Sequence, residues 1–154
     1  KAATAKAGFV HYEVWSFGKP GYFSIHNSSY WLGKSYLGLG PSAHSFDGHK
    51  RSWNFSNNSQ YIKALANDEL PLNSEILTAE NRFNEYLMTG LRTMWGVSLE
   101  HIEREFGSEF QSALLNNASS HVASENLVLE NHHLKITPKG QFLSDGIASD
   151  LFIL

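Results

Sequence analysis

The sequence predicts an α+β fold in two parts, a strand-containing first part and a mainly helical second part. Residues 1–61 hold 13 of the 20 aromatic side chains and six basic against two acidic residues. Residues 62–154 carry six basic against 13 acidic residues, and their apolar side chains recur at helical spacing. The order of signals in the second part, helices followed by a hairpin and a last helix, resembles a winged helix.

Composition excludes several classes of protein. A chain of 154 residues is expected to form about one domain. Its net charge of −3 and its 42% hydrophobic content exclude a disordered chain and give no overall attraction to nucleic acid. No apolar run approaches the ~18 residues of a membrane span. The sequence has no cysteine, which excludes disulfides, a thiolate nucleophile and a cysteine-ligated zinc or iron–sulfur cluster.

The first part, residues 1–61, is predicted to contain the end of a helix and two strands. Lys1–Ala7 is expected to be the end of a helix that Gly8 terminates. Val10–Phe17 is rich in β-branched and aromatic residues and predicts one strand. Tyr36–Gly40 is a short apolar run that predicts a buried strand, and His26–Trp31 is expected to be a loop between the two. Because two strands do not make a stable sheet, we expect this part to belong to a larger one.

The second part predicts helices and one hairpin. Gly90 lies inside an amphipathic helical pattern, where glycine is unfavourable, so we expect a neighbouring element to pack closely against it. The expected elements are helices at Gln60–Ala66 (capped by Ser59), Leu77–Trp95, Leu99–Phe106 (capped by Ser98) and Glu109–Ala118 (capped by Ser108), strands at Leu127–Glu130 and His133–Ile136, and a last helix from Thr137-Pro138 to Ala148.

Three kinds of site are disfavoured by the residues themselves. The helix that would enter a DNA groove, Glu109–Ala118, has one acid and no base, so we expect no nucleic-acid binding. Gly40-Pro41-Ser42-Ala43-His44 lacks the final glycine of a hydrolase nucleophile elbow. The histidine pairs lack the spacing of a zinc site on one helix. Gly38-x-Gly40 is a weak cofactor signal that is more typical of a tight turn after a strand.

The densest polar and aromatic cluster is His26-Asn27-Ser28-Ser29-Tyr30-Trp31, in the basic part. His26 is able to ligate iron or donate to a carboxylate, and the two aromatic rings offer flat faces to a macrocycle. The alternative is a loop whose aromatic side chains fill the core and whose histidine only forms a hydrogen bond. Spacing alone favours this second interpretation and does not exclude the first.

The order of motifs resembles the second half of the oxygen-independent coproporphyrinogen III oxidase-like proteins, in the haem-chaperone (HemW-like) branch of the radical S-adenosylmethionine proteins. The resemblance extends over nearly all 154 residues. The motifs that carry it are Tyr12-Glu13-Val14-Trp15-Ser16-Phe17-Gly18-Lys19-Pro20-Gly21, His26-Asn27-x-x-Tyr30-Trp31, Tyr36-Leu37-Gly38-Leu39-Gly40-Pro41-Ser42-Ala43-His44-Ser45, Arg51, Asn54, Tyr61, Glu85, Gly90-Leu91-Arg92, Gly96-Val97 and Leu134-x-Ile136-Thr137-x-x-Gly140.

The resemblance implies the last strands of a partial (β/α) barrel in residues 1–55 and a helical C-terminal domain in residues 56–154, winged-helix-like at about 97–154. It also implies a [4Fe-4S] cluster and S-adenosylmethionine in the full-length protein, and a cytoplasmic location. The family's Cys-x-x-x-Cys-x-x-Cys motif is absent here, so we expect this chain to have no radical activity alone.

Residue roles carried over from the family form three groups. The three groups are His26, Asn27, Tyr30 and Trp31 for haem binding, Gly38, Gly40, Ser42 and Ala43 for the nucleotide cofactor, and Lys19, Lys34 and Arg51 for the carboxylates of the tetrapyrrole. Glu85 and Arg92 belong to none of these groups and are expected to form an interdomain ion-pair network rather than part of a catalytic site.

The expected function is haem or tetrapyrrole binding and chaperoning, with a haem-recipient protein as a further partner. The first alternative is a true coproporphyrinogen III decarboxylase of porphyrin biosynthesis. The second is a winged-helix protein that binds nucleic acid. Because the apolar run at Leu37–Leu39 is expected to lack its barrel neighbours, we also expect the chain to self-associate.

Overall fold

The structure is a computed structural model that describes residues 2–153. The chain forms two compact units, a larger one of Lys1–Leu32 with Ala79–Leu154 and a smaller one of Gly33–Thr78. This division differs from the boundary expected at residue 55, because the strand Lys50–Asn54 pairs with the strand Leu72–Ile76. The origin of residues 1–55 in a barrel stays a prediction.

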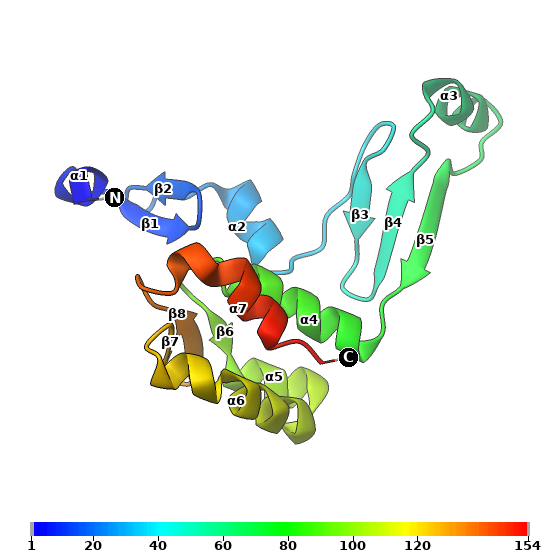
Figure 1. Cartoon of the computed structure of the whole chain (residues 1–154). Coiled ribbons are helices and arrows are strands. Elements are labelled where there is room, and N and C mark those ends of the chain that lie inside the picture. The colour runs from blue at the N-terminus through cyan, green and yellow to red at the C-terminus, as the bar shows by residue number, and fades with distance from the viewer. Residues whose placement is uncertain (1, 154) are drawn as a thin grey trace. The chain divides into compact units, whose positions relative to one another are not determined.

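The larger unit contains most of the helices and two of the three sheets (Figure 1). Its elements in chain order are α1 (Ala2–Lys6), β1 (Val10–Glu13), β2 (Ser16–Gly18), α2 (Ile25–Trp31), α4 (Ala79–Gly90), β6 (Val97–Ser98), α5 (Leu99–Phe106), α6 (Ser108–Ala123), β7 (Leu127–Glu130), β8 (His133–Ile136), the 3₁₀ helix η1 (Gln141–Leu143) and α7 (Ser144–Asp150).

The core of the larger unit lies among α4–α7 and the sheet of order β6-β8-β7. Phe83 and Leu87 of α4 are fully buried, as are Ile102 of α5 and Leu114 of α6. The expected close packing at Gly90 is confirmed, since a Cβ there would lie 2.6 Å from Cγ1 of Val97. The helix expected over Leu77–Trp95 is shorter than predicted and ends at Gly90.

Two predictions from local signals are confirmed in this unit. The Ser98 side chain accepts a hydrogen bond from the His101 amide and caps α5, which ends at Gly107. The hairpin β7–β8 turns at Asn131 and His132, both at positive φ, as a tight two-residue turn requires.

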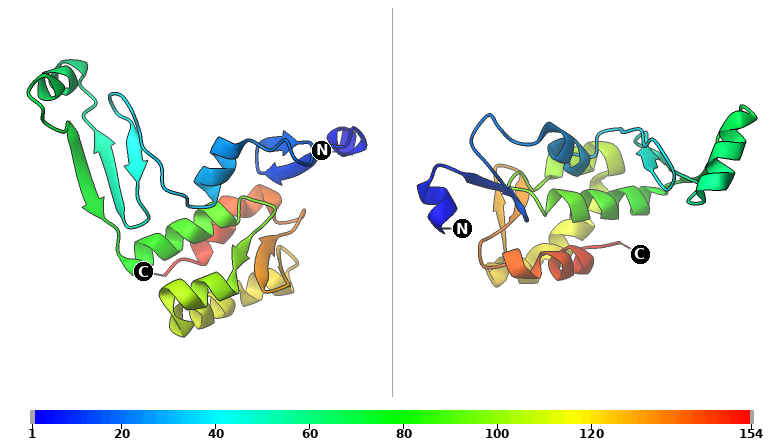
Figure 2. Two further views of the ribbon diagram at one scale, coloured as in Figure 1. Left: turned by 180° about the vertical axis from the view of Figure 1, so that it is seen from behind. Right: turned by 90° about the horizontal axis from the view of Figure 1, so that it is seen from above.

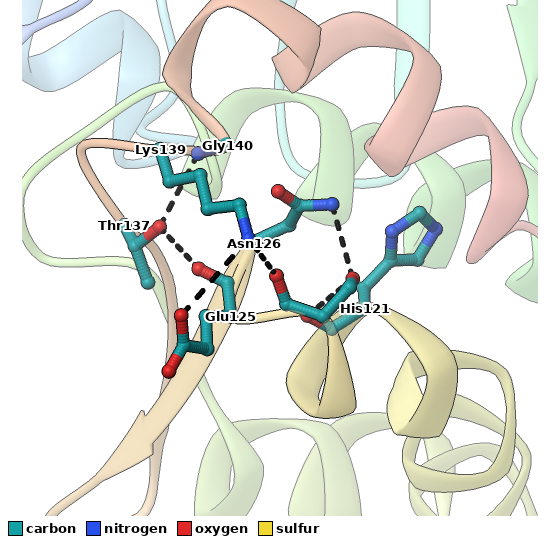
Figure 3. A network of polar contacts seen from close by, with 7 residues as sticks. His121, Glu125, Asn126, Thr137, Lys139 and Gly140 are labelled. Carbon is teal, nitrogen blue, oxygen red and sulfur yellow. Dashed lines mark hydrogen bonds and ion pairs between the residues drawn. The ribbon is translucent and has the colours of Figure 1, made fainter.

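The base of this hairpin is closed by a polar network (Figure 3). The Thr137 amide donates to the Asn126 carbonyl at 3.0 Å, and the Thr137 hydroxyl donates to the Glu125 carbonyl at 2.7 Å. Lys139 Nζ donates to the Ser124 carbonyl at 2.9 Å. These bonds fix the direction in which the chain leaves β8, and therefore the position of η1 and α7.

The starts of α6 and α7 differ from the prediction. α6 begins directly after Gly107 with no side-chain cap, so Ser108 is its first residue rather than its cap, and it continues to Ala123. The last helix does not begin at Thr137-Pro138 but at Ser144, after η1. The reason is that the Thr137 hydroxyl accepts from the Gly140 amide and holds this segment as a turn.

The single strand expected over Val10–Phe17 is instead the antiparallel hairpin β1–β2. Glu13 causes the reversal, because its carboxylate accepts from the Trp15 amide at 3.2 Å and from the Ser16 hydroxyl at 2.8 Å. The Val14 amide donates to the Arg92 carbonyl and ties the turn to the segment after α4.

The smaller unit is a three-stranded antiparallel sheet with one helix (Figure 2). Its order is β3-β4-β5, and its elements are β3 (His44–Phe46), β4 (Lys50–Asn54), α3 (Asn58–Ala66) and β5 (Leu72–Ile76). The buried strand expected over Tyr36–Gly40 is wrong, since Tyr36 forms only an isolated bridge to Phe46 and Leu37 and Leu39 are exposed. α3 is capped by Asn57 rather than by Ser59, because the Asn57 side chain accepts from the Gln60 amide.

Residues 2–153 contain neither a membrane-spanning helix nor a cluster of metal ligands. None of the helices in that range has both the length and the hydrophobicity to cross a bilayer. No three histidine, aspartate or glutamate side chains within it are grouped as the ligands of a metal ion.

Candidate functional site

The cluster His26–Trp31 lies on the helix α2, not in the loop expected from the sequence. The Ser24 side chain caps this helix by accepting from the Asn27 amide at 3.2 Å. Residues four apart lie on the same side of a helix. The spacing therefore places His26 with Tyr30, and Asn27 with Trp31, on two adjacent strips of the helix surface.

The first strip faces solvent. On this strip His26 is exposed and Tyr30 is 48% exposed, and Asn27 on the second strip is also exposed. The imidazole of His26 forms no hydrogen bond or ion pair with any residue in the part of the chain that the structure describes. The rings of Tyr30 and Trp31 meet edge to face, with centroids 5.0 Å apart. An accessible imidazole beside a half-exposed aromatic ring is suited to a flat ligand that carries a metal ion.

The start of α2 is anchored by aromatic packing. The buried ring of Tyr12 stacks on Phe23 with centroids 4.4 Å apart, and its hydroxyl accepts from the Ser24 amide at 3.3 Å. A Cβ at Gly18 would lie 2.8 Å from the Phe23 ring, so glycine at this position allows Phe23 to approach. The hairpin β1–β2 therefore positions the cap of α2.

The end of α2 is held by Arg92, which follows α4. The guanidinium carbon of Arg92 lies 5.2 Å from the centre of the Trp31 ring, a cation–π contact. The same guanidinium donates to Oδ1 of Asp145 on α7 at 3.1 Å. Arg92 thus pairs with Asp145 within the larger unit, whereas the interdomain network expected for Glu85 and Arg92 stays a prediction.

Arg92 also lines a hollow of about 690 Å³ between the β1–β2 hairpin and the segment η1–α7. Trp15 and Phe142 on its walls are 80% and 98% exposed. Phe17 lies there with its ring stacked on His11, the centroids being 4.3 Å apart. A hollow of this volume, partly lined by exposed aromatic rings, is large enough for part of a flat ligand.

The three cations assigned to tetrapyrrole carboxylates are not brought together in one unit. Lys19 lies in the larger unit, where its ammonium is 5.8 Å from the centre of the Phe9 ring. Lys34 and Arg51 lie in the smaller unit. Lys34 is exposed, whereas Arg51 pairs with Glu75 at 3.8 Å. Lys19 is therefore the member of this set that shares a unit with α2.

The residues assigned to the nucleotide cofactor all lie in the smaller unit, and most of their amides are already used. The Gly38 amide donates to the Ser45 hydroxyl at 2.9 Å, and the Ser42 amide donates to the Phe55 carbonyl. The Ala43 amide donates to the Gly40 carbonyl. A Cβ at Gly38 would lie 2.2 Å from the His44 carbonyl oxygen, which explains this glycine by packing.

Ser42 also lines a hollow of about 450 Å³ with Trp53 and Gln60. This hollow lies beside the residues that were assigned to the cofactor. The Asn54 side chain donates to the Gly40 carbonyl at 2.8 Å and keeps the loop in place beside it.

The sequence pattern did not reveal two contacts of the site. One joins Arg92 to Trp31, and the other joins Asp145 to Arg92. Arg92 and Asp145 are 53 positions apart and belong to no common motif. The helical form of α2 was detectable in principle, because Ser24 stands three residues before Asn27 and the four polar and aromatic residues repeat at a spacing of four.

Comparison with known proteins gives one family. Residues 77–143 match the model of the HemN C-terminal domain. The chain is 32% identical to the haem chaperone HemW of Lactococcus lactis over 93% of its own length, and 30% identical to HemW of Mycobacterium tuberculosis over 97%. The chain spans 38% and 37% of the length of these two relatives.

The fold has a counterpart among solved structures. The coproporphyrinogen III oxidase HemN of Escherichia coli, described as a radical SAM enzyme, superimposes with a TM-score of 0.73 at 17% identity. The match covers 98% of this chain and 38% of that protein. The resemblance found in the sequence is confirmed: the chain is similar to HemW proteins in sequence and to HemN in fold, and residues 77–143 match the HemN C-terminal domain.

Proposed function

Because residues 77–143 match the HemN C-terminal domain and almost the whole chain is similar to HemW, we propose that this chain binds haem or a related tetrapyrrole for a haem chaperone. The observation that carries the proposal is the exposed face of α2. It presents the unpartnered imidazole of His26 and the half-exposed ring of Tyr30 on one strip. In this proposal His26 faces the iron, and Tyr30 and Trp31 lie against the macrocycle.

Of the two other cofactors of the family, this chain lacks the ligands for one, and we propose that it contacts the other. A [4Fe-4S] cluster held by thiolates does not fit this chain, because the chain has no cysteine. Any cluster and any radical step would depend on residues outside it. Contact with the nucleotide cofactor at Gly38, Gly40, Ser42 and Ala43 stays a proposal, supported only by the hollow beside Ser42.

We assign the segment β6–α5–α6–β7–β8 a winged-helix-like role in contacting protein rather than nucleic acid. The order of its elements, a short strand, two helices and a hairpin, supports this assignment. However, α6 carries Glu109 and neither lysine nor arginine, and phosphate binding needs such cations. A haem-recipient protein is the partner we propose for this face. The cytoplasmic location stays a prediction.

The proposal is tested by titrating the 154-residue chain with haem. We expect a saturable shift of the Soret band, and an affinity that falls about tenfold or more in His26→Asn, because an axial ligand is lost. His132→Asn is the matched control, since it removes an exposed histidine at a positive φ that asparagine tolerates. The absence of a saturable shift, or equal affinities in the two variants, would contradict the proposal.

The alternative, a coproporphyrinogen III decarboxylase, is favoured only by the likeness of fold to HemN. Complementation of a strain that lacks this step, by the complete protein from which the chain comes, separates the two functions. Rescue supports the decarboxylase, and failure of rescue together with haem binding supports the chaperone.

A further inference from the structure

Arg92 lies outside the haem-binding motif, but it contacts that motif and a neighbouring hollow at the same time. It contacts Trp31 of α2 with one face of its guanidinium, and its side chain also lines the hollow between β1–β2 and η1–α7. The side chain of Arg92 is 21% exposed, and its Nε is buried with no acceptor among the described residues. The motif helix and the hollow therefore share one cation.

The walls of the hollow suit a flat apolar body with an acidic group. Trp15 and Phe142 offer exposed ring surface, and the stacked pair His11–Phe17 adds a rigid flat wall. Arginine binds carboxylates through two parallel hydrogen bonds, and its charge is not lost at any pH met by proteins. A macrocycle with peripheral carboxylates combines these two features in one molecule.

Asp145 already gives Arg92 a carboxylate partner. One guanidinium nitrogen donates to Oδ1 of Asp145 at 3.1 Å, and the Asp145 side chain is 71% exposed. An exposed ion pair of this kind contributes little to stability. A ligand carboxylate can therefore replace Asp145 on Arg92 at low cost, with Asp145 turning toward solvent.

We propose that the hollow holds the edge of the tetrapyrrole, with one of its carboxylates on Arg92 in exchange for Asp145. This inference rests on the proposed function and names the residue that recognises the anionic edge of its ligand. Arg92 thereby joins the carboxylate to Trp31, the last residue of the motif helix. Asp145 acts as a competitor for Arg92 in the free protein.

The test measures binding of haem and of haem dimethyl ester, in which both carboxylates are blocked. Arg92→Gln is expected to weaken haem binding about tenfold or more, since a charge-assisted pair is lost, and to weaken binding of the diester, which has no free carboxylate, much less. Asp145→Asn is expected to tighten haem binding severalfold, because the competing carboxylate is removed. A gain in affinity also cannot arise from misfolding.

Asp150→Asn is the control for general electrostatics. Asp150 lies on the same helix and on the same hollow, but its carboxylate pairs with His121 at 3.1 Å and not with Arg92. We expect at most about a twofold gain in haem affinity from its loss. An equal gain in the two asparagine variants would overturn the exchange at Arg92.

The outcomes separate this inference from the proposed function. A chain that binds neither ligand contradicts the proposed function itself. A chain that binds haem equally well with and without Arg92 and Asp145 retains the proposed function and overturns the inference. Weaker binding of haem in both Arg92→Gln and Asp145→Asn would also overturn it, because that result assigns the pair to positioning Trp31 instead of to exchange with a ligand carboxylate.

Discussion

The two units of this chain bury their apolar residues very differently. In the larger unit Phe83, Leu87, Ile102 and Leu114 are completely buried in one cluster. In the smaller unit the buried apolar side chains are small or near its ends, and Leu39 and Ile76 are 83% and 82% exposed. The larger unit thus has the core of an independent domain, whereas the smaller unit is a sheet with few buried contacts of its own.

This difference bears on where function resides. The α2 motif is anchored on the well-packed unit through Tyr12, Arg92 and their partners, so its geometry is set by a stable core. The Gly38–Ala43 loop belongs to the unit that buries less. A site that works in this chain alone is therefore expected on the larger unit first.

The sharpest contrast is between two leucines. Leu87→Ala removes a fully buried side chain from α4 and is expected to lower the free energy of unfolding by about 2–5 kcal/mol. Leu39→Ala, at an exposed position of the smaller unit, is expected to change it by about 0.5 kcal/mol or less. Urea unfolding followed by circular dichroism measures both. Equal losses would remove the distinction between the units.

A pair of glycines with similar backbone gives the next contrast. Gly96 and Gly40 both have positive φ, at 70° and 95°. A Cβ at Gly96 would lie 2.4 Å from the Leu134 carbonyl oxygen, whereas nothing lies within 4 Å of one at Gly40. We expect Gly96→Ala to lower the free energy of unfolding by about 2–4 kcal/mol and Gly40→Ala to lower it by about 1 kcal/mol, both measured by urea unfolding. If Gly96→Ala lost no more stability than Gly40→Ala, the backbone around Gly96 would have to adjust to a Cβ, and the contrast would fail.

Self-association is expected to arise from the exposed apolar run of the smaller unit. Leu37→Ser with Leu39→Ser is expected to raise the dissociation constant of any oligomer about tenfold, because about 1–2 kcal/mol of apolar contact is removed. Leu129→Ser, on the half-exposed edge of β7, is the control in the larger unit. Light scattering over a range of concentrations measures this. A chain that is monomeric throughout would contradict the expectation.

The two units are also expected to lose stability over different pH ranges. Burial lowers the pKa of His101 in the larger unit below its ordinary value of 6.5, so its folded state binds fewer protons than the unfolded state. This stabilising term is present above pH 6.5 and is lost as the pH falls below it. Hydrogen bonds from the His49 and Lys50 amides lower the pKa of Asp47 in the smaller unit below 3.8, so its contribution is lost only under more acidic conditions.

The measurement is the urea midpoint between pH 7.5 and 5.5. We expect the wild-type chain to lose slightly more stability over this range than His101→Gln, while Asp47→Asn follows the wild type. A His101→Gln profile that coincides with the wild-type profile would show that this histidine is not the source of the dependence.

Features set by neighbouring residues were predictable from the sequence. The cap of α5 by Ser98, the turn at Asn131-His132 and the close packing at Gly90 each depend on residue types with a strong local preference. The order of helices followed by the hairpin β7–β8 follows from such local signals.

Features set by contacts between distant residues were not predictable. The hairpin β1–β2 has no glycine or proline at its turn, and it forms because Glu13 accepts from Trp15 and Ser16 while Val14 bonds to the distant Arg92. The motif residues of α2 were identified by resemblance, but Arg92 and Asp145 were not placed with them. Their pairing depends on how α7 packs beside α4 (Figure 1).

The most direct test of the account is amide hydrogen exchange of this chain with and without haem. If the exposed face of α2 binds the tetrapyrrole, haem slows exchange in Ile25–Trp31, and the amides of Gly33–Thr78 exchange as before. Slower exchange confined to Gly33–Thr78, with α2 unchanged, would contradict the assignment of the ligand to the larger unit.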